Sequence, residues 1–142
     1  MSDHARDAEV ERALLVSRLR AWRTSLLALH KVLVDAELAR YGAAFGAING
    51  PHHALTLLSD DPWFQRLRPF LVLVVQIDER LADERPVTAG EVEAWRVETR
   101  ALLQSPADTP VGRDYQRSLQ ELPAAVVLHG KLMALTKDEP SR

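Results

Sequence analysis

The feature that most constrains this chain is a long segment without helix breakers. Between Ala8 and Phe45 the sequence contains no proline and one glycine, and its apolar residues recur at alternating steps of four and three. At about 1.5 Å per residue, the segment predicts one amphipathic helix about 55 Å long. The spacing places one apolar stripe on that helix, formed by Leu15, Leu19, Trp22, Leu26, Leu29, Leu33 and Ala36.

Stop and start signals divide the middle of the chain into shorter helices. Residues 46–51 include two glycines, an asparagine and a proline that end the first helix, and residues 52–58 predict a short connecting helix. Asp60 or Asp61, followed by Pro62, predicts the start of a helix that reaches Leu81. The run PFLVLVVQI also suits a buried strand, but no second such run exists to pair with it, so a helix is favoured. Pro69 is expected to kink or divide this helix.

Further helix starts follow the same capping chemistry. Thr88 and Glu91 have the spacing of a capping box, in which each side chain satisfies a free backbone N–H. Thr109 before a proline repeats the cap, and Pro123 separates the last helical segment. These signals predict an all-α protein, an antiparallel bundle of four to five helices in a single domain over residues 1–142. Residues 1–7 and 137–142 are expected to be disordered tails.

Composition excludes several classes of function. The chain has no cysteine, which removes disulfides, thiol nucleophiles and cysteine-bound metals. Its net charge of −2 provides no general field for nucleic acid. No apolar run approaches the roughly 20 residues of a membrane helix, and no basic start precedes an apolar run. Phosphate-loop, dinucleotide and Glu-x-x-His motifs are absent as well. We therefore expect a cytoplasmic protein without a nucleic-acid or membrane partner, a metal or a cofactor.

The length of the first helix predicts an interface. Because the helices that follow are much shorter, part of the first helix is expected to lack a partner within the chain. Leu15, Leu19 and Trp22 would then be exposed, and soluble monomers rarely leave such stripes open. The sequence therefore predicts a homodimer in which a second chain covers these three residues, or a protein partner that does so.

Ionisable residues on apolar helix faces form a candidate polar site. His30 and Glu37 lie about 40° and 20° from Leu26 on the first helix, at 100° per residue. Asp78 lies among Leu71, Val74 and Leu81, where a carboxylate must be paired; the candidate partners are Arg23, Arg40, Arg68, His30 and, less directly, His129. His30, Glu37, Arg68 and Asp78 could converge on a ligand inside the bundle. The favoured alternative is that they form a structural network that fixes helix register.

Two segments carry a resemblance to known sequences. LHKVLVDAE, from Leu29 to Glu37, and DPWFQRLRPFLVLVVQIDE, from Asp61 to Glu79, resemble segments of small uncharacterised bacterial all-helical proteins. The resemblance implies a bacterial origin and attaches no activity. Two hypotheses remain: a non-enzymatic module that dimerises or binds a partner helix, and a small-molecule or metal-dependent enzyme that uses the polar site.

Overall fold

The regular secondary structure of the described residues is entirely helical. The computed structural model describes residues 2–138, and within them there are six α-helices, one 3-10 helix and no strand. The all-α prediction is confirmed, although the helices outnumber the four to five expected. Their bounds are α1 Asp3–Phe45, α2 Gly50–Asp60, η1 Pro62–Leu67, α3 Arg68–Ala82, α4 Ala89–Leu103, α5 Pro110–Glu121 and α6 Pro123–Leu135.

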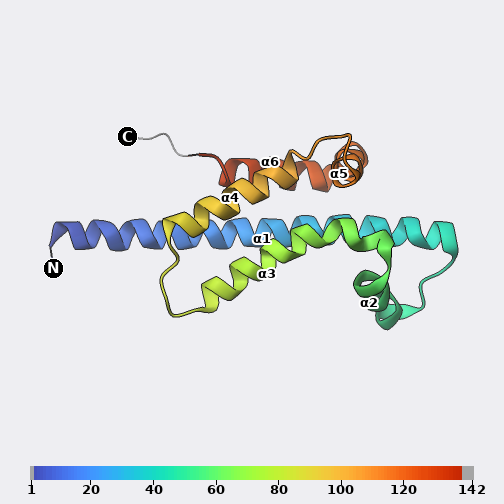
Figure 1. Cartoon of the computed structure of the whole chain (residues 1–142), viewed down its shortest axis with the longest axis horizontal. Coiled ribbons are helices and arrows are strands. Elements are labelled where there is room, and N and C mark those ends of the chain that lie inside the picture. The colour runs from blue at the N-terminus through green and yellow to red at the C-terminus, as the bar shows by residue number, and fades with distance from the viewer. Residues whose placement is uncertain (1, 139–142) are drawn as a thin grey trace.

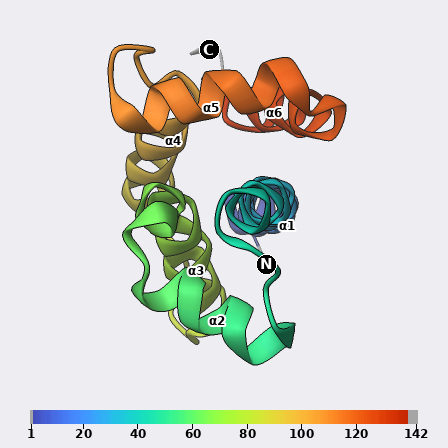
Figure 2. The same cartoon turned by 90° about the vertical axis from the view of Figure 1, so that its right-hand side faces the viewer.

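Helix α1 is the axis around which the other helices are arranged (Figure 1). Its 43 residues span about 65 Å, against 15 residues in each of α3 and α4. Helices α3 and α6 both pack along α1, and α4 packs on α3. Helix α5 crosses from α4 to α6 (Figure 2). Figure 2, which looks along α1, shows that the helices cover only part of its circumference. Between residues 20 and 35, the uncovered face of α1 carries Arg20, Thr24, Leu27, Lys31 and Asp35.

The hydrophobic core lies between the middle of α1 and the helices that cover it. The apolar stripe of α1 predicted from the sequence supplies five of its largest buried side chains: Leu19, Trp22, Leu26, Leu29 and Leu33. The opposing surface comes from α3, α4, α5 and α6, through Phe70, Leu73, Val74, Ile77, Trp95, Leu103, Tyr115, Ala125 and Leu132.

The predicted caps are present and fix where the helices begin. Thr88 Oγ1 accepts a hydrogen bond from the Glu91 backbone N–H at 3.2 Å, and the Glu91 carboxylate accepts one from the Thr88 N–H at 3.1 Å. Thr109 caps α5 by accepting from the Gly112 N–H. A side chain at Gly112 would meet the Pro106 carbonyl oxygen, which lies 2.0 Å from where its Cβ would stand. Only glycine therefore lets α5 start this close to the end of α4.

The orientation of α3 differs from the sequence-based expectation. Leu71, expected in the core, is largely exposed, while Phe70, Leu73 and Ile77 are buried. The helix expected over residues 62–81 is divided into η1 and α3. The division falls between Leu67 and Arg68, next to Pro69, where a kink or a break was predicted. A 3-10 helix advances about 120° per residue instead of 100°, so six residues rotate everything after them relative to one continuous α-helix.

The ends of the chain also differ from expectation. Residues 3–7, expected in a disordered tail, form the first turns of α1, where Ser2 accepts a hydrogen bond from the Ala5 N–H at 3.3 Å. Residues 137–138 follow the last helix, and residues 139–142 of the predicted C-terminal tail lie outside the described residues. Across residues 2–138, no helix has the length and apolar character needed to cross a membrane.

Candidate functional site

Glu37 lies at the centre of a polar network that joins three helical segments. Its buried carboxylate accepts hydrogen bonds from Trp63 Nε1 at 2.9 Å and Arg117 Nη2 at 3.1 Å, and contacts Arg40 Nη1 at 3.3 Å. Arg40 also pairs with Glu121. These contacts bind α1 to η1 and α5, and they satisfy a carboxylate that would otherwise be costly to bury.

The space beside Glu37 is too small for a substrate. A cavity of about 10 Å³, lined in part by Glu37, Trp63, Asp114 and Tyr115, is the internal space at this network. A cavity of that size holds about one water molecule. Burial raises the pKa of the Tyr115 phenol, which bonds to His129 Nδ1 at 2.8 Å. The geometry is that of a packed structural network.

Asp78 is paired as expected but is less buried than expected. Arg23, one of the three arginines considered as partners, reaches it with Nε–Oδ1 and Nη2–Oδ2 distances of 2.5 and 3.1 Å. The Asp78 side chain remains 43% exposed because the rotation of α3 moves position 78 to the edge of the packed face. The hydrogen bond that Arg23 donates to Asp78, followed by the negative charge of Asp78, raises the pKa of Arg23. The prediction of a buried Asp78 is therefore wrong.

The four residues of the predicted polar site do not converge. His30 is half-buried on α1, where burial lowers the pKa of its imidazole, and it makes no hydrogen bond within residues 2–138. Arg68 is exposed at the start of α3. Among the described residues, no hydrogen bond or ion pair joins any two of His30, Glu37, Arg68 and Asp78. Within the same residues, no three histidine or carboxylate side chains are grouped so that they could hold a metal ion.

Leu19 and Trp22 are covered by their own chain. Both side chains are 1% exposed, and Trp22 Nε1 donates to Thr99 Oγ1 of α4 at 3.1 Å. The expectation that a second chain covers these two residues is wrong, because α3, α4 and α6 fold back over this part of α1. Leu15, one turn earlier, is half-buried.

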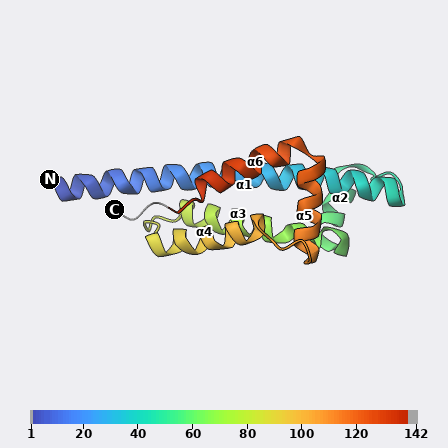
Figure 3. The ribbon, with the colours of Figure 1, turned by 90° about the horizontal axis from the view of Figure 1, so that it is seen from above.

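The uncovered part of α1 lies further toward the N-terminus than predicted. Every residue from Ser2 to Leu14 is exposed, and Figures 1 and 3 show this end of the helix projecting past its neighbours. Val10 and Leu14, 58% and 66% exposed, share a face with two small residues. We call this face the α1 docking surface, which consists of Val10, Ala13, Leu14 and Ser17.

The α1 docking surface adjoins a shallow depression. This depression measures about 460 Å³ and is lined by Glu9, Arg12, Ala13, Val16, Ser17 and Arg20. At 100° per residue, the docking surface faces away from Leu19 and Leu26 and continues the uncovered face of α1. The sequence stripe did not predict this surface, because Val10 and Leu14 lie outside it. The helical spacing of residues 10, 13, 14 and 17 was the sequence signal that could have predicted it.

A second exposed apolar surface lies between α3 and α4. It is an open groove of about 490 Å³, whose apolar walls include Pro69, Val72 and Leu102 and whose rim includes Arg68 and Glu98. Arg68, predicted for the internal polar site, therefore borders an external groove. The groove carries no strong charge of one sign that would select a partner.

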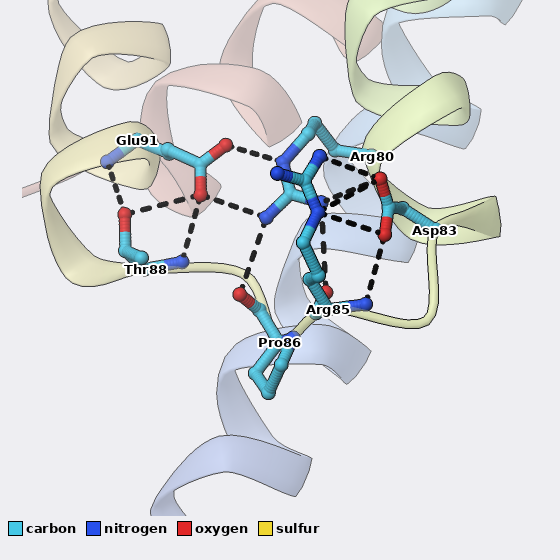
Figure 4. Close-up of polar contacts among 6 residues, drawn as sticks. All are labelled: Arg80, Asp83, Arg85, Pro86, Thr88 and Glu91. Carbon is cyan, nitrogen blue, oxygen red and sulfur yellow. Dashed lines mark hydrogen bonds and ion pairs between the residues drawn. The ribbon is translucent and has the colours of Figure 1, made fainter.

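A second cluster of ion pairs, away from Glu37, has a structural role. In the turn between α3 and α4, Arg80 bonds to the Glu91 carboxylate and to the Pro86 carbonyl oxygen, and Arg85 pairs with Asp83 (Figure 4). The Arg80 hydrogen bond, followed by that of the Thr88 backbone, lowers the pKa of Glu91 to about 2. The hydrogen bonds of Arg85 likewise hold the pKa of Asp83 well below its usual range. Each carboxylate is used in closing the turn.

An exposed aromatic cluster lies at the opposite end of α1. The Tyr41 and Phe45 rings are 4.9 Å apart, and the edge-on Trp63 ring lies 5.7 Å from each of them. Phe45 is largely exposed. Trp63 also donates to Glu37, so the cluster fixes η1 against the end of α1.

Comparisons with known proteins add no family assignment. The chain matches no protein-family model, no curated protein and no solved structure. The function must therefore be argued from the molecule's own surfaces.

Proposed function

We propose that this protein is a non-enzymatic helical interaction module that binds a protein partner through the α1 docking surface. The observation that carries the proposal is the projecting end of α1, where residues 3–14 are helical yet exposed throughout. These residues continue a helix that the packed section of α1 nucleates, but no tertiary contact adds to their stability. A partner packed on Val10 and Leu14 would supply the missing contacts.

The enzymatic alternative has weaker support. It requires a polar site inside the fold, but Glu37 and Asp78 are engaged in separate pairs, and the cavity beside Glu37 holds about one water molecule. Neither His30 nor Arg68 contacts either carboxylate through a hydrogen bond or ion pair within residues 2–138. A projecting helix with an apolar face is, by contrast, a common means of recognition between proteins.

A position-specific crosslink tests the proposal. A photoreactive phenylalanine analogue in place of Ala13 should give, in cells, a covalent adduct of one discrete mass. The matched control has the analogue at Lys31, which is exposed on the packed section of the same helix. A second control combines the label at position 13 with Leu14→Asp, which should abolish the adduct. Equal labelling from positions 13 and 31, or an adduct that survives Leu14→Asp, would contradict the proposal.

A further inference from the structure

Charge is divided along the N-terminal half of α1. Residues 3–11 contain four carboxylates and one arginine, a net charge of −3 with His4 neutral. Residues 12–23 contain four arginines and no carboxylate, a net charge of +4. We call these the acidic segment and the basic segment. The α1 docking surface spans the boundary between them.

Most of these charges form no ion pair within residues 2–138. None of Asp3, Asp7, Glu9 and Glu11 forms an ion pair in the part of the chain that the structure describes, and all four are exposed. Within the same residues, Arg12 and Arg20 also form none. The other two arginines of the basic segment do have partners: Arg23 pairs with Asp78, and Arg18 donates to the Leu135 and Lys137 carbonyl oxygens at 2.7 Å each.

The acidic segment extends beyond what helix capping requires. Negative charge stabilises a helix N-terminus, but that effect falls off within the first turn. Asp3 lies in that turn. Glu9 lies in the second turn and lines the depression together with Arg12 and Arg20, and Glu11 lies in the third turn. Their charge therefore remains available to a partner.

We propose that the partner is a second copy of this chain, bound with its α1 antiparallel to the first. The inference rests on the proposed function and names its partner. In this orientation the acidic segment of each copy lies against the basic segment of the other, and two-fold symmetry makes both contacts equivalent. A parallel pair would place like charges together and be disfavoured.

The side chains at the boundary suit this arrangement. Ala13 and Ser17 are small and exposed, so two helices can approach closely there, while Val10 and Leu14 supply apolar contact on the same face. Because this face points away from the core, the second copy needs no rearrangement of α3 or α6.

Charge reversal tests the orientation. The purified full chain should sediment as a dimer whose dissociation constant rises with salt, because exposed charges are screened. One variant carries Glu9→Arg and Glu11→Arg, and the other carries Arg12→Glu and Arg20→Glu. For each variant alone, the dissociation constant of the dimer should be at least about 10-fold higher than for the original chain. The reason is that about four exposed charge contacts are lost in each symmetric pair. An equimolar mixture should recover association as a heterodimer.

A matched control separates local from general charge effects. Asp60→Arg with Asp108→Arg changes net charge by the same amount as the Glu9→Arg and Glu11→Arg variant, at two exposed carboxylates that form no ion pair within residues 2–138. This variant should dimerise like the original chain, and circular dichroism should show equal helix content in all variants.

The outcomes distinguish the two proposals. A dimer that is unaffected by either reversal, or two variants whose mixture fails to associate, would overturn the antiparallel orientation while leaving the interaction module intact. If the chain stays monomeric at high micromolar concentration while position 13 crosslinks in cells to a protein of another mass, the second copy is the wrong partner. A monomer without a position-specific crosslink would overturn both.

Discussion

The N-terminal third of α1 and its middle section belong to one continuous helix but have opposite environments. From Leu19 to Leu33 the helix buries its apolar stripe under α3, α4 and α6, whereas from Ser2 to Leu14 it buries nothing. The middle section shows that apolar spacing becomes a core where later elements return to cover it. The N-terminal third shows that regular helical structure continues past the point where the core ends.

Trp22→Ala should produce the largest difference between these sections. Truncating a buried tryptophan costs about 3–5 kcal/mol, and here it also leaves the buried Thr99 hydroxyl without its donor. Leu14→Ala, on the projecting section, should change the free energy of unfolding by less than about 0.5 kcal/mol when measured below the dimer concentration range. Urea unfolding measures the free energy of unfolding of both variants. Equal losses of that free energy would mean that the two sections of α1 are not distinct.

Glu37→Ala should be the next most disruptive change. It leaves Arg117 and Trp63 without their shared acceptor in a partly buried network, at a cost of about 2 kcal/mol. Asp78→Ala, at a half-exposed pair, should cost only a small fraction of that. Chemical denaturation at neutral pH compares them. A milder effect for Glu37→Ala than for Asp78→Ala would contradict the burial assigned to each.

His30 should make the middle section sensitive to mild acid. Burial lowers the pKa of His30 in the folded chain below its ordinary value of 6.5, so the unfolded chain binds the proton more tightly. The contribution of neutral His30 to the free energy of unfolding is therefore full above about pH 6.5 and declines as pH falls below that value. His30→Leu should flatten the stability profile between pH 7 and 5, as thermal unfolding would show. An unchanged slope would place the imidazole in water.

Glu91 should give the smallest effect, at lower pH and outside α1. Its pKa is about 2 in the folded chain against an ordinary value of 4.5. The contribution to stability is present above pH 4.5 and is lost as pH falls from there toward 2. Glu91→Gln should therefore remove part of the acid-induced loss of stability in that range while leaving the His30-dependent slope between pH 7 and 5 unchanged.

Local signals predicted the helices well. The box of Thr88 and Glu91, the cap at Thr109 and the break at Pro123 each act within a few residues, so the sequence alone specifies them. The rotation of α3 was not predictable in the same way. Sequence spacing does not reveal that residues 62–67 adopt a 3-10 turn, and that turn changes which side of α3 meets the core.

The candidate site was predictable only in part. The apolar neighbours of Glu37 indicated its burial, but two of its partners, Trp63 and Arg117, lie on η1 and α5, whose placement the sequence did not specify. Similarly, helical spacing grouped Leu19 and Trp22 with Leu15 as one exposed interface. The spacing shows which residues share a stripe, but not how far along it the returning helices reach.

The packing of α6 against α1 has a consequence for the order in which the protein can fold. Arg18 bonds to the carbonyl oxygen of Leu135, 117 residues away, and α6 is the last helix of the fold. During synthesis, the apolar stripe of α1 leaves the ribosome long before the helix that covers it has been translated. The core therefore cannot close until α6 has emerged, and a nascent chain arrested before residue 123 exposes Leu26 and Leu29 to chaperones and to other nascent chains.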